Sequence, residues 1–293
     1  MGKFKIGVMA ESFRLPMADA LAAARRIGAD GVQLTVSHGE LAYDGMTDGR
    51  VEWLLGLLRE NGLEVSALNG DFGGHGFARA DETPARVEKT KRVIDLAVKL
   101  GTRIVTTHAG VIPSNPSDAR YATLQTAFRE VGAYAAGRGV TLAIETGPES
   151  PETLRAFLES LGGAPGVISG VGVNLDPANF VMVTGEDPAR AVRLLAPYIV
   201  HTHAKDGVML KKTDPQILYD FFAEGGIEDL RIEEYFTEKP LGQGAVDFDA
   251  YLAELSRAGF SGYLTVERET GADPASDIEL AVRFLSRFAN ENA

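Results

Sequence analysis

One short pattern recurs along the chain and limits the folds that it can adopt. A helical stretch ends at a glycine and is followed at once by a run rich in β-branched residues, as in RRIGADGVQL, ENGLEVSAL, KLGTRIVTTH, AGRGVTLAIE and RAGFSGYLTVE. Glycine readily takes the left-handed conformation that ends a helix, and β-branched residues favour strands. Three further runs, at 4–10, 171–176 and 199–204, bring the number of expected strands to eight.

Helical patterns separate these strands. They cover Met17–Ile27, Asp48–Glu60, Pro84–Leu100, Ala119–Ala136, Pro151–Leu161, Pro188–Leu195, Phe248–Ala258 and Pro274–Phe288. Because such alternation implies parallel strands joined by crossovers, we predict an α/β fold, a (β/α)8 TIM barrel, as a single domain over residues 1–293. A doubly wound open sheet is the alternative. The first strand argues against it, because AESF follows that strand in place of a glycine-rich dinucleotide fingerprint.

One interval is longer than a barrel requires. Between the seventh strand and the helix that begins at Phe248, residues 207–245 form an insertion with an aromatic helical stretch, ILYDFFAE, at Ile217–Glu224. Long insertions in a compact domain often serve as lids or binding segments. We therefore expect this insertion to be a lid, a subunit contact or both.

Composition excludes several classes of protein. The 41 acidic and 29 basic residues give a net charge of −12, which opposes nucleic-acid binding because phosphates require a basic surface. Without cysteine, the chain cannot form disulfides, cysteine-bound zinc sites or thiol nucleophiles. No apolar run approaches the roughly 20 residues of a membrane span, and the first residues lack the apolar core of a signal peptide. We expect a cytoplasmic protein with no membrane or nucleic-acid partner.

The two faces of each predicted strand can be read from the sequence, because side chains alternate along a strand. Near the ends of the last four strands, the aliphatic residues share one face and the small or polar residues share the other. In a barrel the aliphatic face packs against the helices and the other face points inward. The inward face carries Glu145, Asp176, His203 and Glu267. We therefore predict that these four side chains converge at the end of the barrel where active sites of this fold lie.

Three carboxylates crowded beside an imidazole repel one another unless a cation or protons neutralise them. Any one of these acids could simply cap the helix that follows its strand. Four such residues on matching faces favour a metal site instead. Three hard oxygen ligands and one nitrogen suit Mn²⁺, Mg²⁺ or Co²⁺, with Zn²⁺ as a further alternative. We expect one divalent metal ion, with Mn²⁺ as the first choice.

The segments that carry these residues resemble the xylose isomerase-like TIM-barrel superfamily and, within it, the sugar (phosphate) isomerase and epimerase branch. The similar segments are LAIET, VNLDPANF, VHTHAKD, LGQGAVDFDAYLAEL and GYLTVE, and the likeness covers essentially the whole chain. The resemblance implies one catalytic metal bound by Glu145, Asp176, His203 and Glu267. It also implies that the two glutamates are the catalytic acid and base, that the substrate is a small carbohydrate, and that the assembly is a homodimer or homotetramer.

These roles predict the class of reaction. A ketose or related hydroxy-ketone would bind the metal, one glutamate would remove a proton beside the carbonyl, and the metal would stabilise the resulting enediolate. Return of the proton to the same carbon gives epimerisation, and return to the neighbouring carbon gives isomerisation. With a leaving group on the next carbon, the outcome would be elimination. A metal-dependent dehydratase or lyase acting on a keto-polyol or keto-glycoside is therefore the alternative.

Two hypotheses of other kinds can be weighed against these. A DNA-repair endonuclease of the same fold would need a histidine-rich site for three zinc ions, whereas the chain has five histidines in all. The acidic charge also opposes DNA binding. A non-catalytic sugar-binding barrel would bind the metal without exchanging protons between substrate and solvent.

Four further residues are candidates for substrate contacts. His108 ends the fourth strand, Lys205 shares the inward face of the seventh, and Glu11 ends the first. Asn179 stands where relatives of the ketose 3-epimerase and endonuclease types carry a histidine. His201 should lie one layer deeper, in a supporting position.

A glycine-rich loop, NGDFGGHG at 69–76, could also approach a ligand. It lacks the lysine and serine of a phosphate-binding loop, so phosphate binding there is unsupported.

Overall fold

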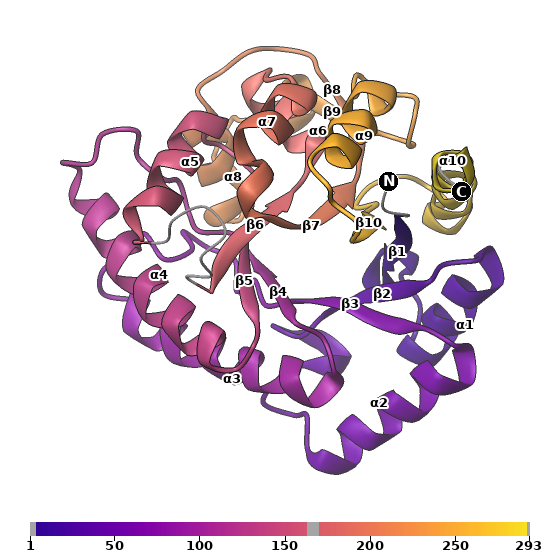
Figure 1. The fold of residues 1–293 in the computed structure, drawn as a ribbon. Helices are drawn as coiled ribbons and strands as arrows, with labels where there is room; N and C mark the ends of the chain where they lie inside the picture. The colour runs from indigo at the N-terminus through magenta and orange to yellow at the C-terminus, as the bar shows by residue number, and fades with distance from the viewer. Residues whose placement is uncertain (1–3, 163–169, 292–293) are drawn as a thin grey trace.

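Eight parallel strands close into a barrel in the computed structural model, which describes residues 4–162 and 170–291 (Figure 1). The strands are β1 (Lys5–Met9), β2 (Gly31–Thr35), β3 (Glu64–Asn69), β4 (Ile104–Thr107), β5 (Thr141–Glu145), β6 (Val171–Leu175), β7 (Ile199–Ala204) and β10 (Tyr263–Val266). Because β1 pairs in parallel with both β2 and β10, the sheet closes on itself. The predicted (β/α)8 barrel is confirmed and the open sheet is wrong.

Helices surround the barrel (Figure 1). They are α1 (Met17–Ile27), α2 (Asp48–Asn61), α3 (Thr83–Leu100), α4 (Ala119–Gly137), α5 (Pro151–Ser160), α7 (Pro188–Leu195), α9 (Phe248–Arg257) and α10 (Pro274–Glu291), with short 3₁₀ turns η1 (Ala10–Phe13), η2 (Gly39–Leu41) and η4 (Ala196–Tyr198). The recurring glycines end helices in the left-handed conformation, as expected: Gly28 and Gly101 follow α1 and α3 with φ of 89° and 78°. None of the described helices is both long and apolar enough to span a membrane.

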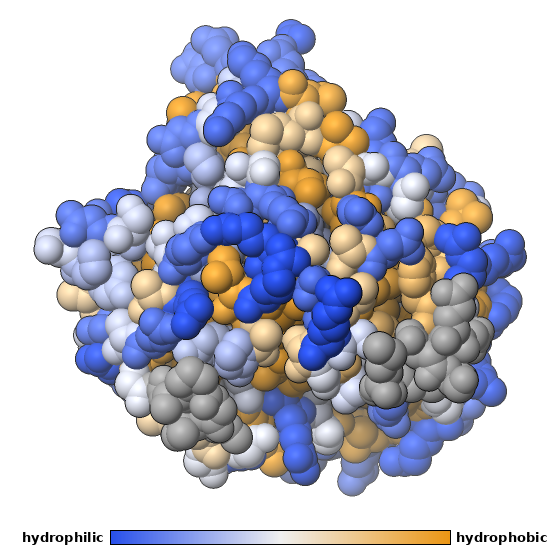
Figure 2. Space-filling model, turned by 45° about the horizontal axis from the view of Figure 1, so that its top comes forward, coloured by the Kyte–Doolittle hydropathy of each residue, from blue (hydrophilic) through white to orange (hydrophobic). Residues whose placement is uncertain are grey.

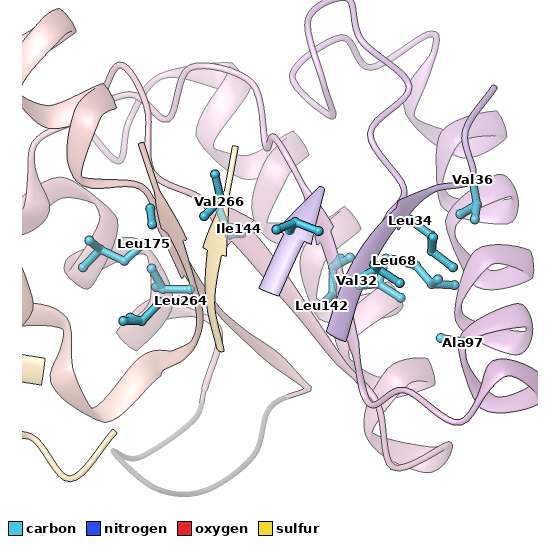
Figure 3. Close-up of a cluster of buried hydrophobic side chains, with 14 of the residues drawn as sticks. Val32, Leu34, Val36, Leu68, Ala97, Leu142, Ile144, Leu175, Leu264 and Val266 are labelled. Carbon is cyan, nitrogen blue, oxygen red and sulfur yellow. The ribbon is translucent and has the colours of Figure 1, made fainter. Parts of the chain in front are cut away.

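The hydrophobic core lies between the strands and the helices. Leu142 and Ile144 of β5, and Leu264 of β10, point outward from the barrel and are completely buried (Figure 3). These are the aliphatic residues that strand alternation assigns to the outer face. Hydrophilic side chains cover much of the surface in Figure 2, with apolar ones between them. The other face of each strand is therefore free to carry polar groups inside the barrel.

The structure contains elements that the sequence patterns did not predict. After β6 the chain forms the short helix α6 (Pro177–Asn179) and the π-helical turn η3 (Phe180–Thr184). The insertion contains the antiparallel strands β8 (Asp206–Met209) and β9 (Phe236–Lys239), with α8 (Pro215–Ala223) and the 3₁₀ turn η5 (Ile232–Glu234) between them. The aromatic stretch ILYDFFAE is helical as expected from Ile217 to Ala223, within α8, and Glu224 is the C-cap. That the insertion acts as a lid or a subunit contact remains a prediction.

One buried carboxylate fastens both ends of the insertion. Asp206, 1% exposed, accepts hydrogen bonds from the backbone N–H groups of Gly207, Gly242, Gly244 and Val246 at 2.8–3.1 Å. A Cβ atom on Gly244 would lie 2.1 Å from the carboxylate, so only glycine fits there. The HAKD and LGQGAV segments, far apart in sequence, are therefore two parts of one joint.

Candidate metal centre and active site

Four strands bring four potential ligands together inside the barrel. Glu145 ends β5, Asp176 follows β6, His203 lies in β7 and Glu267 follows β10. One ligand atom from each lies within 4.8 Å of all the others, and none of the four residues is more than 9% exposed. We call this group the ligand cluster. In the barrel, β6 and β7 lie between β5 and β10, so the two glutamates enter from the two sides of the cluster.

The imidazole of His203 faces all three carboxylates. Its Nδ1 atom lies 3.3 Å from Glu267 Oε2, 3.5 Å from Glu145 Oε1 and 3.6 Å from Asp176 Oδ2. Ligands about 2.1 Å from a common octahedral ion would lie about 3.0 Å apart when adjacent and about 4.2 Å apart when opposite. The observed spacing therefore suits four ligands around one small divalent ion.

Two atoms of the ligand cluster lack any hydrogen-bond partner. His203 Nδ1 and Asp176 Oδ2 are both buried and face each other across the cluster. The other carboxylate oxygen of Asp176, Oδ1, accepts from the N–H groups of Ala178 at 2.7 Å and Asn179 at 3.2 Å and so caps α6. Asp176 thus caps a helix with one oxygen and leaves the other free. Because buried polar atoms are rarely left without partners, the cluster fits a bound cation.

A glutamine that the sequence analysis did not single out orients the imidazole. Gln33 Oε1 lies 3.2 Å from His203 Nε2 and 2.9 Å from His201 Nε2, while its amide nitrogen donates to Thr106 Oγ1 at 3.2 Å. Because the amide oxygen can only accept, His203 Nε2 carries a hydrogen, and Nδ1 is the ring nitrogen that faces the carboxylates and would bind a metal after losing its proton. His201 lies one layer deeper, as expected. An amide side chain between Val32 and Leu34 in the β2 run GVQLT was the only signal for Gln33.

Lys205 supplies a buried positive charge beside the ligand cluster. Its Nζ donates to Glu267 Oε2 at 3.0 Å and also to Glu269. Burial alone would raise the pKa of Glu267, but Lys205 and His203 outweigh burial and hold it well below its usual value. Burial would likewise lower the pKa of His203, but Glu267 and Glu145 outweigh it and raise that pKa well above the usual value. Without a metal, His203 is therefore cationic at neutral pH.

A second acid–imidazole pair lies on the other side of Glu145. His108 Nδ1 lies 2.9 Å from Asp71 Oδ2, and His108 Nε2 lies 3.7 Å from Glu145 Oε1. Burial would lower the pKa of His108, but the charges of Glu145 and Asp71 raise it to about 10. The pair therefore carries a proton next to Glu145 at neutral pH.

The glycine-rich loop at 69–76 brings Asp71 to His108. Phe77 N–H donates to the carbonyl of Ala109 at 2.7 Å, so the loop is tied to the segment that follows β4. Gly76 has a φ of 58°, and a Cβ there would lie 2.4 Å from the backbone of Ala109. Glycine at position 76 therefore allows the backbone of the loop to approach the backbone of Ala109 closely.

A cavity of about 260 Å³ opens above the ligand cluster. Three of the four predicted substrate contacts line it beside Glu145 and Glu267, namely His108, Asn179 and Lys205, together with Asp71 of the glycine-rich loop. Asn179 Nδ2 donates to the carbonyl of Thr146 at 2.9 Å and lies 3.4 Å from Glu145 Oε1. The lining also includes residues of α8, from the stretch ILYDFFAE in the predicted lid or subunit contact. Phe236 of β9 and Glu269 line it too, and neither was singled out in the sequence.

Glu11 is not among the described residues that line this cavity. Its Oε1 accepts from the N–H of Thr35 at 2.9 Å, and its Oε2 is buried without a partner. Burial raises the pKa of Glu11 to about 7, against the opposing effect of that hydrogen bond. The structure gives this residue a supporting contact with β2.

Comparisons with known proteins agree with this architecture. The family model of the xylose isomerase-like TIM barrel matches residues 21–288. A xylose isomerase domain protein from Planctomyces limnophilus is 24% identical, with 99% of this chain and 98% of that chain covered and a TM-score of 0.79. The probable 3-DHS dehydratase AsbF, involved in petrobactin synthesis in Bacillus anthracis, is 19% identical, with coverage of 97% and 99% and a TM-score of 0.74.

A third similar structure is the 3-keto-D-glucoside 4-epimerase YcjR from E. coli. It is 16% identical, with 97% of this chain and 100% of that chain covered and a TM-score of 0.71. No protein of curated function matches the sequence significantly. At these identities the three structures establish a shared fold.

Proposed function

The chain belongs to the xylose isomerase-like TIM barrel family, and from this premise we propose that it is a divalent-metal-dependent sugar isomerase or epimerase acting on a ketose or related hydroxy-ketone. The observation that carries the proposal is the ligand cluster, with four buried ligand atoms within 4.8 Å and two of them unpartnered. The epimerase among the similar structures supports the choice of reaction.

The four residues of the ligand cluster would hold the ion, with Mn²⁺ as the first choice. When bound, it would supply a Lewis acid that stabilises negative charge on a substrate oxygen. The two glutamates would move the proton, because they approach from β5 and β10 on the two sides of the cluster. Glu267, which Lys205 and His203 keep ionised by lowering its pKa, would be available to accept that proton. Glu145, when protonated, would donate a different proton from the other side, and exchange with solvent would restore both carboxyl groups.

Three cavity residues would orient the substrate. Lys205 would hold Glu267 in place through their 3.0 Å hydrogen bond and offer its ammonium to a substrate oxygen. Asn179 would steady Glu145 from the start of the π-helical turn. His108, fixed by Asp71, would donate to a hydroxyl near Glu145.

A metal-dependent dehydratase or lyase acting on a keto-polyol or keto-glycoside is the second candidate. The protonated His108 favours it, because an imidazolium beside Glu145 can donate a proton to a departing oxygen. The likeness to a probable 3-DHS dehydratase supports the same alternative.

Solvent-deuterium exchange with a panel of ketoses and keto-glycosides tests the proposal. We expect deuterium to enter the carbon next to the carbonyl when Mn²⁺ is present, to stop after exhaustive chelation, and to return when Mn²⁺ or Co²⁺ is restored. Unsaturated products in place of exchanged sugars would establish the lyase. Activity unchanged by chelation would count against a metal-dependent mechanism. Metal binding without any deuterium exchange would instead support a non-catalytic sugar-binding barrel.

A further inference from the structure

The cavity above the ligand cluster has two chemically different walls. The barrel side carries the carboxylates, His108, Asn179 and Lys205. The opposite side is built by η3, α8 and β9, and presents Met182, Leu218, Tyr219, Phe222 and Phe236. A substrate in this cavity would therefore meet hydrogen-bonding groups on one side and apolar surface on the other.

The apolar wall is held firmly in place. Met182 and Leu218 are each 3% exposed. Met182 packs onto β8 so closely that a Cβ on Gly207 would lie 2.2 Å from its sulfur. The hydroxyl of Tyr219 already donates to the carbonyl of Gly74 at 3.1 Å. A sugar hydroxyl buried against this wall would lose its hydrogen bonds to water, at a cost of about ten-fold or more in affinity.

The apolar wall also continues out of the cavity. Phe222, at its outer end, is 61% exposed, although a phenyl ring in water is unfavourable. Its ring centre lies 6.3 Å from that of Phe236 and 5.4 Å from that of Phe221. Phe222 and Phe236 line the cavity and Phe221 does not, so the three rings form an aromatic platform that continues from the cavity lining to the exposed Phe222.

The charges of the cavity argue against an anionic substrate. Among the described lining residues, the cations are Lys205 and His108, and each is already paired. Lys205 contacts Glu267 and Glu269, and His108 contacts Asp71. A phosphate or carboxylate would therefore find acids around it and no unpaired cation among the described lining residues.

We propose that the substrate is an uncharged sugar derivative with an aromatic substituent, specifically a glycoside with a carbonyl on its sugar ring. The sugar lies against the ligand cluster, and the aglycone packs between Leu218, Phe222 and Phe236. This inference rests on the proposed function, which supplies the need for a carbonyl. A glycoside has lost the anomeric carbonyl, so the reactive carbonyl must lie elsewhere on the ring.

Two glycosides that differ only in the aglycone test this inference. We would measure equilibrium binding of phenyl and methyl D-glucopyranosides, in both anomers, to the Mn²⁺-loaded protein by calorimetry. We expect the phenyl member of at least one pair to bind about ten-fold more tightly or better, because its ring is buried on the platform. Glucose 6-phosphate should not compete.

Two single-residue variants of α8 test whether Phe222 causes the tighter binding of the phenyl glycosides. Phe222→Ala should bring the phenyl-to-methyl ratio close to one while leaving the methyl glycoside unaffected. Ile217→Ala is the matched control, because Ile217 lies on the same helix, is 41% exposed and does not line the cavity. It should keep the wild-type ratio.

Three results would overturn the inference: no measurable binding of either phenyl glucoside, equal binding of phenyl and methyl forms, or a ratio unchanged by Phe222→Ala. Competition by glucose 6-phosphate would overturn the uncharged substrate. Failure of the proposed function is recognised separately, since it would appear as an absence of metal-dependent deuterium exchange while the phenyl preference persisted.

Discussion

The two halves of the barrel contribute differently to its carboxyl end. The half formed by β5, β6, β7 and β10 provides all four residues of the ligand cluster. The half formed by β1–β4 provides Gln33, Thr106, Glu11 and, through the following loops, Asp71 and His108.

Both halves bury acids, but they neutralise them differently. Glu267 lies beside Lys205 and His203, which lower its pKa, whereas Glu11 has a backbone N–H as its partner and a raised pKa. From this contrast we expect the half with the ligand cluster to carry the metal and the acid–base pair of the proposed reaction, and the other half, apart from His108, to hold those side chains in position. The predictions below test that division of labour.

The largest effect should come from the two glutamates of the ligand cluster. Glu145→Gln and Glu267→Gln should each lower the rate of deuterium exchange by at least about 100-fold, because each removes a proton carrier. Circular dichroism should show an intact fold. Glu64→Gln, at the opposite end of the barrel where Glu64 contacts Lys5, is the control and should exchange normally. A variant at position 145 or 267 with the wild-type rate would not belong to the acid–base pair.

Gln33 lies in the half formed by β1–β4, which supplies none of the four ligands, yet it should affect how tightly the metal binds. Gln33→Leu removes the acceptor for His203 Nε2, so we expect about 10- to 100-fold weaker Mn²⁺ binding in a titration. Gln125→Leu, which removes an amide contact with Ser160 among the outer helices, is the matched control. An unchanged Mn²⁺ affinity in Gln33→Leu would show that Gln33 does not orient His203 for metal binding.

Metal binding should also release protons. The pKa of His203 is raised in the metal-free protein, so its Nδ1 carries a proton at neutral pH that the metal must displace. Affinity should therefore rise with pH, by about ten-fold per pH unit for each proton released. Calorimetry in buffers of different ionisation enthalpy should give a release of about one proton or more. Heats that do not depend on the buffer would contradict a charged His203.

The smallest effect should come from Glu11. Its pKa is about 7 when folded and near 4.5 when unfolded, so the folded state binds the proton more tightly. Stability should therefore fall as the pH rises from about 4.5 through 7, by about 3 kcal/mol. Glu11→Gln, which mimics the neutral form, should remove this loss and be more stable than wild type at pH 8 but not at pH 4.5. Urea unfolding at both pH values measures this, with exposed Glu52→Gln as the control.

Strand alternation predicted more of this molecule than any other pattern. A period of two residues determines which face a side chain occupies, so the order of residues along β5 and β10 is enough to assign Glu145 and Glu267 to the inner face. Eight strand–helix units predicted the barrel, because each unit is local in the sequence, whereas the pairing of β1 with β10 that excludes the open sheet comes from the structure.

Contacts between distant loops could not be predicted in this way. The approach of Asp71 to His108 depends on the close packing of Gly76 against Ala109, which no local pattern encodes. The residues of η3, FVMVT, are β-branched and apolar and do not indicate a helical turn, although Asp176 caps the helix before it. Strands β8 and β9 pair segments separated by the whole of α8.

The joint at Asp206 has a consequence for how barrels of this kind could be redesigned. Because four amides on both sides of the insertion converge on a single carboxylate, the chain leaves the barrel and returns to it at nearly the same point. An exchange of the residues between Gly207 and Gly242 would have to retain Glu238, because its buried carboxylate accepts from Arg268 and from the N–H groups of Glu269 and Thr270, just after Glu267.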